Sequence, residues 1–315
     1  MFLILVRREQ QNKADIQEAE ALINNIHKFV NIINRKKNTT EVCGKKFRTH
    51  CDTRFLSNLH CLRDVESQLE TLYNSQFTSP PFIEGNEQIL FDQIYNNRRT
   101  VHTLIQIYTM FEYPVVSLQS STLPTLHKVW PMVIDITEKL ERLCETSNEI
   151  GKVLIKSTLA ALERKVSKGF ISEYHKIATV LNPSTRKLNG VSAIEKQRVY
   201  TAIRTRLDMP SRQNLHRPQS SMEAPDDDAD ELNAYLNGTY TDITSPEFDI
   251  LQFWYDRRFQ FQQLFKIAMK ILCVPATSCS PERAFSVVKK LIPDSRSNLC
   301  AETVKKIMIG KSLKS

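Results

Sequence analysis

Glycine is scarce in this sequence, and glycine-rich phosphate-binding motifs are missing altogether. Only 7 glycines occur among 315 residues, which is few for an all-β or Rossmann-type protein, because the turns of those folds use glycine. Neither GxGxxG nor GxxxxGK is present. These absences disfavour a nucleotide-binding α/β enzyme and favour a mainly α-helical protein.

Paired cysteines and long apolar runs are also missing. The 7 cysteines are odd in number and scattered, without a CxxC pair, which indicates reduced thiols. No apolar run approaches the ~18 residues that read as a membrane span, and the apolar residues 1–6 are too few for a signal peptide. We therefore expect a soluble protein that is not secreted and lies in the nucleus or otherwise in the cytoplasm.

The charge balance is basic. The net charge is +8, the pI is near 9.1, and the hydrophobic content of 41% is ordinary for a globular protein. A basic surface suits nucleic acid, but an excess of solvated lysine is an equal alternative. Because no base-reading motif is present, we expect DNA binding that is at most weak, salt-sensitive and independent of sequence.

Cysteine and histidine gather in one early segment, which raises the question of a metal site. The residues concerned are Cys43, His50, Cys51, His60 and Cys61. Their spacings do not fit the paired-ligand frameworks of zinc sites. We expect no metal here.

Apolar residues recur at helical spacing through residues 1–207. The pattern predicts helices at 7–37, 51–73, 84–112, 124–146, 148–182 and 190–207. Short loops between long helices indicate antiparallel neighbours, and hence a helical bundle domain over 1–207. Prolines and an acidic run predict a linker at 208–247. The stripe of the first helix comprises Ile16, Ala19, Leu22, Ile23, Ile26, Phe29, Val30 and Ile33.

The most hydrophobic stretch begins at Ile250. Its apolar residues recur at three- and four-residue steps up to Leu272, which predicts one helix that Val274-Pro275 ends. A second helix is expected from Ser280, and a third carries Val304, Ile307 and Met308. Three helices this apolar need a partner surface.

These residues carry a resemblance. The pair Phe253-Trp254, the apolar helix after it and the stretch VPATSCSPERAFS (274–286) resemble the C-terminal signature of hAT-superfamily DNA transposases. Thr53-Arg54-Phe55 is similar to the family's Thr-Arg-Trp motif, and the stretches 123–131 and 177–188 are similar to two further landmarks. The resemblance spans about residues 48–310, most of the chain.

The resemblance implies a fold and a catalytic residue. The expected fold is mainly α: a helical bundle of the hAT insertion type, then at 248–315 the C-terminal helices of an incomplete ribonuclease-H-like domain. Glu282 matches the third of the three acids that hold two metal ions in the family. The other two precede the Thr-Arg-Trp motif, and the 52 residues before that motif here predict helix and loop. We therefore expect Glu282 to be vestigial and the chain to use no cofactor, unless a complete divalent-metal site were assembled.

The function implied is dimerisation, as a homodimer or as a heterodimer with related hAT proteins, without a membrane. Two alternatives stay open: a subunit or truncated gene model of a hAT transposase that acts on DNA ends, and a non-specific DNA-binding protein. Arg54 and Phe55 would touch DNA by resemblance, although Phe55 could instead pack on a neighbouring helix. Trp254, likewise, could pack under residues 177–207 within one chain. The residues assigned to dimerisation are Phe253, Trp254, Phe261, Leu264, Phe265, Phe285, Val304, Ile307 and Met308.

Overall fold

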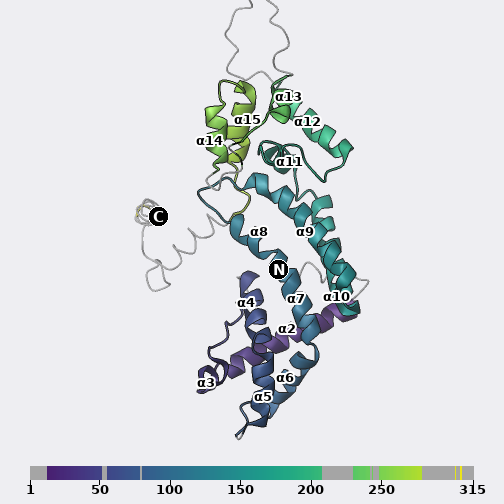
Figure 1. The fold of residues 1–315 in the computed structure, drawn as a ribbon, viewed down its shortest axis with the longest axis vertical. Coiled ribbons are helices and arrows are strands. Elements are labelled where there is room, and N and C mark those ends of the chain that lie inside the picture. The colour runs from purple at the N-terminus through teal and green to yellow at the C-terminus, as the bar shows by residue number, and fades with distance from the viewer. Residues whose placement is uncertain are drawn as a thin grey trace, which may run out of the picture. The chain divides into compact units, whose positions relative to one another are not determined.

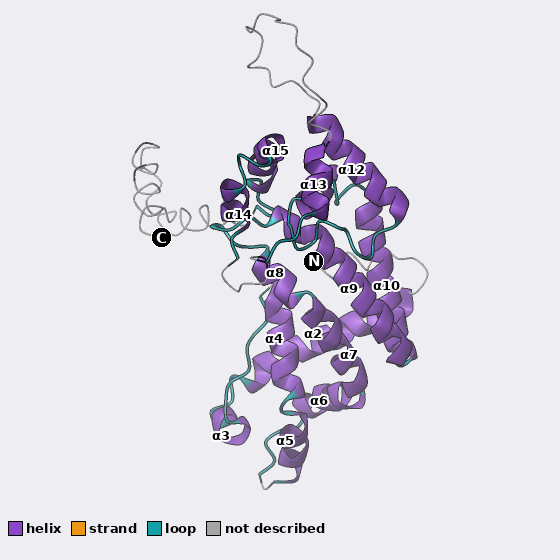
Figure 2. Cartoon of the chain, turned by 45° about the horizontal axis from the view of Figure 1, so that its top comes forward, coloured by secondary structure: helices purple, strands orange, loops and turns teal. Residues whose placement is uncertain are grey.

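A computed structural model describes residues 13–51, 55–78, 80–207, 230–241, 243, 248–278, 302 and 306. Every regular element in these ranges is a helix (Figure 2), which confirms the predicted mainly α fold. None of the described helices combines the length and apolar character that crossing a bilayer takes. The chain divides into two compact units, of which unit 1 comprises residues 1–114 and 132–171 and unit 2 comprises 115–131 and 172–315.

Unit 1 is a helical bundle that its first long helix crosses. Helix α2 (Lys13–Ile33) packs on α4 (Phe55–Glu66), α6 (Asn86–Asn96) and α10 (Glu149–Ser167) (Figure 1). All eight residues of the stripe predicted for this helix are buried. The other elements of unit 1 are α3 (Thr39–Cys43), α5 (Leu69–Asn74), the 3₁₀ turn Ser75–Phe77, α7 (Arg98–Met110), and parts of α8 (Glu112–Ser117) and α9 (Leu126–Thr146).

Three helices predicted within 1–207 are each divided in the structure. The stretch 51–73 breaks after Glu66, between α4 and α5. The stretch 84–112 breaks at Asn97, between α6 and α7. The stretch 148–182 breaks at Gly169, whose φ of 81° is left-handed. There the Gly169 N–H donates to the Val166 carbonyl (3.0 Å) and the Phe170 N–H to the Lys165 carbonyl (3.1 Å). This pair of bonds is the Schellman motif that commonly ends a helix at glycine.

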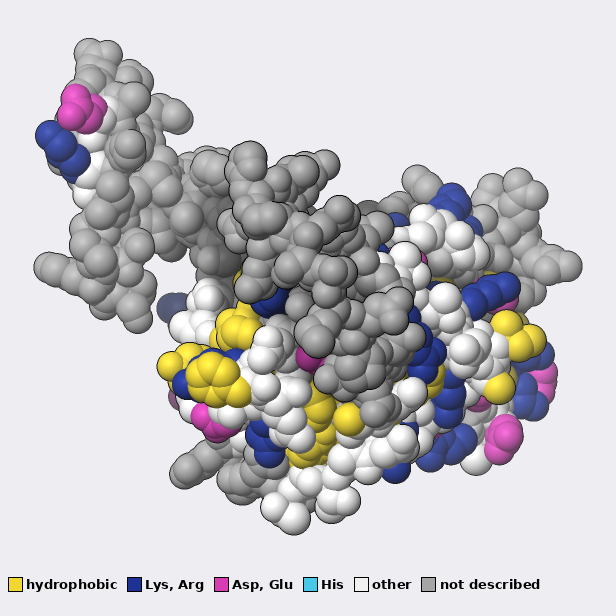
Figure 3. All heavy atoms as spheres, turned by 90° about the horizontal axis from the view of Figure 1, so that it is seen from above, with side chains coloured by type: hydrophobic (Ala, Val, Ile, Leu, Met, Phe, Trp, Pro, Cys, Tyr) yellow, Lys and Arg dark blue, Asp and Glu magenta, His cyan; other side chains and the backbone are white. Residues whose placement is uncertain are grey.

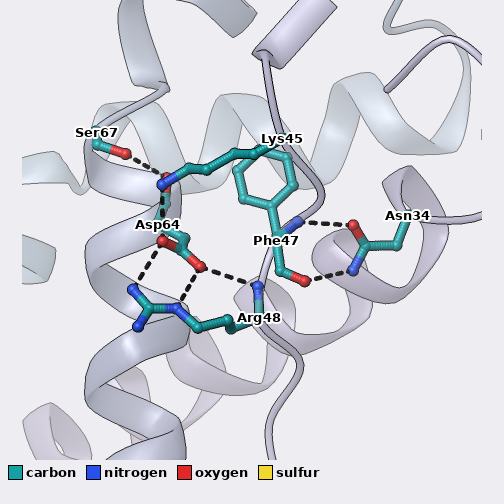
Figure 4. A network of polar contacts seen from close by, with 6 residues as sticks. All are labelled: Asn34, Lys45, Phe47, Arg48, Asp64 and Ser67. Carbon is teal, nitrogen blue, oxygen red and sulfur yellow. Dashed lines mark hydrogen bonds and ion pairs between the residues drawn. The ribbon is translucent and has the colours of Figure 1, made fainter. Parts of the chain in front are cut away.

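A buried carboxylate fastens the loop before α4 to that helix (Figure 4). Asp64, 3% exposed, accepts from the Lys45 Nζ (2.8 Å) and from the backbone N–H and the Nε of Arg48 (both 2.9 Å). The side chain of Asn34 binds the backbone of Phe47, the residue before Arg48. Its Nδ2 donates to the Phe47 carbonyl (2.8 Å), and its Oδ1 accepts from the Phe47 N–H (2.9 Å). Burial by itself would raise the pKa of Asp64, but the hydrogen bonds from Arg48 and Lys45 outweigh it and hold the pKa well below its ordinary value.

Unit 2 gathers the later helices. It contains α11 (Glu173–Val180), α12 (Ala193–Leu207), α13 (Asp230–Asn237), α14 (Ile250–Asp256) and α15 (Gln262–Leu272). Helix α15 packs on each of the other four. Residues 172–207, which we expected in the bundle, group with these helices. The ranges of the predicted domains, including a linker at 208–247 that lies mostly outside the described residues, stay a prediction.

The single helix predicted from Ile250 to Leu272 is two helices. Helix α14 ends at Asp256, and a turn through Arg257, whose φ and ψ are −100° and 13°, leads to α15. The turn brings Phe253 and Phe261, on either side of it, against one buried side chain, Tyr235. Apolar spacing does not reveal this break, because Phe261 lies at a helical interval from Phe253 and would also suit an unbroken helix.

Candidate functional site

An aromatic cluster forms the interior of unit 2. Tyr235, 0% exposed, stands at its centre on α13. Its ring centroid lies 5.0 Å from that of Trp254, 6.0 Å from Phe261 and 6.5 Å from Phe253. Burial raises the pKa of Tyr235 well above its ordinary value, so its hydroxyl keeps its proton and acts as a hydrogen-bond donor.

Two rings of this cluster cap the C-terminus of α11. The last carbonyls of a helix have no partner inside the helix and need outside donors. Tyr235 donates its hydroxyl to the Val180 carbonyl (2.9 Å), and Trp254 donates its Nε1 to the Leu181 carbonyl (2.8 Å). Helices α13 and α14 are thereby fastened to the end of α11 by buried hydrogen bonds.

A distant acid caps the N-terminus of α15. The carboxylate of Glu231, on α13, accepts from the backbone N–H groups of Gln263 (3.1 Å) and Leu264 (3.0 Å). Phe261 occupies the N-cap position and offers no side-chain acceptor. The negative charge also complements the positive end of the helix dipole. Glu231 therefore does for α15 what a capping residue usually does from within the same helix.

The two stretches that resemble family landmarks meet in unit 2. Thr125, 1% exposed, accepts from the Ala276 N–H (2.9 Å), and Thr179 donates its Oγ1 to the His127 carbonyl (3.4 Å). Arg186 donates to the carbonyls of Leu236 (3.2 Å) and Gly238 (2.6 Å) at the end of α13. Stretches 123–131 and 177–188 thus form one body with the C-terminal helices.

The predicted dimerisation residues divide into two groups. Phe253, Trp254, Phe261 and Leu264 are at most 3% exposed within one chain, which is the single-chain packing of Trp254 left open by the sequence. These four side chains hold unit 2 together and keep almost no free area for a partner, so their direct contact with one stays a prediction. Phe265 is half-buried.

Several predicted residues fall outside the described part of the chain. Phe55 begins α4, but its side chain is not among those described. The predicted residues that lie wholly outside the described ranges are Arg54, Glu282, Phe285, Val304, Ile307 and Met308.

The early cysteines and histidines do not gather into a cluster. Cys43 and Cys61 are buried and Cys51 is exposed, and burial raises the pKa of Cys61 to about 12. His50 stacks face to face on His27, with ring centroids 4.1 Å apart. Within the described residues no group of three possible ligands lies close enough to hold a metal ion. The expectation that this segment binds no metal stays a prediction.

A surface feature of α14 and the following turn was not predicted. Tyr255 is 53% and Phe259 75% exposed, and the guanidinium of Arg258 lies 4.1 Å and 4.4 Å from their ring centroids. We call these three residues the aromatic–arginine patch. Hydrophobic side chains lie beside Lys/Arg and Asp/Glu side chains on the face drawn in Figure 3. The patch does not follow from the predicted apolar stripe, because that stripe comprises residues in phase with Trp254 and leaves out Tyr255 and Phe259.

Comparison with known families gives one match. Residues 231–312 match the hAT family C-terminal dimerisation region. Among curated protein sequences, none matches the chain. The matched range begins at the acid that caps α15 and contains the aromatic cluster and the aromatic–arginine patch.

Proposed function

We propose that this chain associates with a second copy of itself or with a related hAT protein. Its residues 231–312 are similar to the C-terminal dimerisation region of the hAT family. The observation that carries the proposal is the match to the dimerisation region. The predicted resemblance to hAT transposases is confirmed for this part of the chain, and the association itself is the proposal.

The packing of unit 2 supports this role. Within the matched range, helices α13 to α15 enclose their own aromatic cluster, and Glu231 caps α15. A partner would therefore meet a body that is already folded. Little conformational entropy would be lost on binding, and more of the contact energy would appear as affinity.

We also propose that the chain alone does not cut or join DNA. The resemblance assigns one metal-holding acid, Glu282, where in-line attack on phosphate uses two metal ions held by several acids. The test is incubation of the purified chain with labelled DNA ends and Mn²⁺. Cleavage that disappears in Glu282→Ala would contradict the proposal.

Association is tested on the intact chain by sedimentation equilibrium. The expected mass is twice the 36.4 kDa of the chain. A run mixed with a differently tagged copy should show exchange between tagged and untagged chains. A species of 36.4 kDa at every concentration up to tens of micromolar would remove the proposal for self-association.

A further inference from the structure

The aromatic–arginine patch is built rather than incidental. Arg258 donates its Nη1 to the Tyr255 carbonyl (2.7 Å) while its guanidinium lies over the rings of Tyr255 and Phe259. The arginine is half-buried between two rings that are themselves exposed. The three side chains therefore hold one another in place at the surface, whereas Phe253 and Trp254 of the same segment are buried.

The composition of the patch suits a protein partner. Tyrosine and arginine are enriched among residues that dominate binding energy, and interface cores are rich in aromatic side chains. An arginine already fixed by a hydrogen bond and two rings loses little rotamer freedom when a partner covers it. Because Phe259 keeps 75% of its area, the patch also has apolar surface left to bury.

We infer that a second copy of this chain covers the aromatic–arginine patch, in a two-fold interface. This inference rests on the proposed function and deepens it by naming the surface. Two observations favour a second copy. The patch lies inside the matched range 231–312, and the exposed Asp256 stands two residues before Arg258 in the sequence, so this segment carries both charges of an ion pair.

Self-complementarity of this kind fits two-fold symmetry. In a two-fold interface each contact occurs twice, with residue i of one copy facing residue j of the other and the reverse. Arg258 of each copy would face Asp256 of the other, on either side of Tyr255 and Phe259. The interface then buries aromatic area at its centre and pairs its charges across the axis.

The test compares variants of the full chain by sedimentation. Phe259→Ser is the test variant, and Phe77→Ser, in unit 1, is the matched control, because both phenylalanines are 75% exposed. We expect Phe259→Ser to raise the dimer Kd at least about tenfold, as loss of an interface anchor does, and Phe77→Ser to leave it within about twofold. If circular dichroism shows that Phe259→Ser has unfolded, Tyr255→Ser takes its place as the test variant.

A charge exchange tests the geometry of the pair. Arg258→Glu and Asp256→Arg should each weaken self-association, and an equimolar mixture of the two should form a mixed dimer more tightly than either variant dimerises alone.

The outcomes separate the surface from the function. If the intact chain dimerises and neither Phe259→Ser nor Tyr255→Ser changes the Kd, the patch is not the interface and the proposed function stands. If Phe77→Ser weakens the dimer as much as Phe259→Ser, the surface assignment is also wrong. If the intact chain is monomeric, the surface assignment fails together with the proposal for self-association, and association with a related hAT protein is the form of the proposed function that then stands.

Discussion

The indole Nε1 of Trp254 donates a 2.8 Å hydrogen bond to the backbone carbonyl of Leu181, 73 residues earlier in the chain. Trp254 is fully buried, as is the Leu181 side chain. The bond joins the aromatic pair at the start of the C-terminal helices to the stretch 177–188, so two separate landmarks of the hAT resemblance are in direct contact.

Replacing Trp254 should therefore be costly. Trp254→Phe removes the donor and leaves a buried carbonyl unpaired, which costs about 1–3 kcal/mol, and the smaller ring adds a void. Urea unfolding followed by circular dichroism measures the loss. Trp130→Phe is the control and should cost less, because the Trp130 ring meets the Lys176 ammonium at 5.5 Å and phenylalanine keeps a ring there.

Glu231 gives a second prediction. Glu231→Ala removes the acceptor for two N–H groups at the start of α15 and should lower the free energy of unfolding by about 1 kcal/mol, as loss of an N-cap does. Glu149→Ala is the control, since Glu149 is 89% exposed and pairs with Lys152 in the first turn of α10. Its replacement should cost clearly less than that of Glu231, because an exposed ion pair contributes little to stability. Equal losses in the two variants would mean that Glu231 does not cap α15.

Asp64 gives a third prediction, in unit 1. Asp64→Asn removes the charge that Arg48 and Lys45 meet in a buried setting. It should cost about 2–4 kcal/mol, somewhat less than breaking a fully buried pair because both cations are half-exposed. Asp135→Asn, at an exposed pair with Lys139, should cost under about 0.5 kcal/mol.

The pKa of Asp64 adds a pH dependence to the same comparison. Because the folded-state pKa is lowered, the carboxylate contributes stability above the ordinary aspartate pKa, and this stability is lost as the pH falls below it. Acid unfolding should therefore be shallower in Asp64→Asn than in the native chain. An unchanged acid transition would argue against the network in Figure 4.

His127 gives a fourth prediction. Burial, and to a lesser degree the Lys128 charge, lowers the pKa of His127 to about 4. Between that value and the ordinary pKa of about 6.5 the unfolded chain binds a proton that the folded chain does not, so stability is full above the upper value and falls as the pH drops. The whole change is about 3 kcal/mol.

The measurement is the urea midpoint at several pH values for the native chain and for His127→Leu. The variant should lose most of the slope in this window, and His175, whose pKa burial also lowers, should account for a smaller remainder. A slope that the variant leaves intact would assign the effect to other groups.

The sequence predicts the first helix well, but it predicts poorly where a helix is interrupted. Ile16, Phe29 and the other stripe residues of α2 are buried as expected, because one apolar face per helix is a local property of the sequence. The break at Gly169 could have been found from the glycine before Ser172 and Glu173, which is a pattern of helix end and helix start. The turn at 257–261 could not have been found from the sequence, because Phe253 and Phe261, on either side of it, stay at helical spacing.

The candidate site shows the same division. The resemblance located the dimerisation region, and the comparison with known families confirms it over 231–312. Which side chain caps which helix was not predictable, because Glu231 and Leu264 are 33 residues apart and periodicity identifies a face without its partner. The exposure of Tyr255 and Phe259 was not predictable for a related reason, since apolar periodicity indicates the buried face of a helix and not which aromatic residues stay exposed.

The interleaving of the two units has a consequence for synthesis on the ribosome. Residues 115–131 belong to unit 2, although unit 1 precedes and follows them in the sequence. The Thr125 hydroxyl accepts from the Ala276 N–H, and Ala276 is synthesised 151 residues later. At about 5–20 residues per second, that delay is about 8–30 s. During it the apolar residues Leu126 and Val129, buried in the finished protein, have emerged without the C-terminal helices. Chaperones that hold nascent chains should therefore bind this segment, and slowing translation after residue 131 should lengthen their stay.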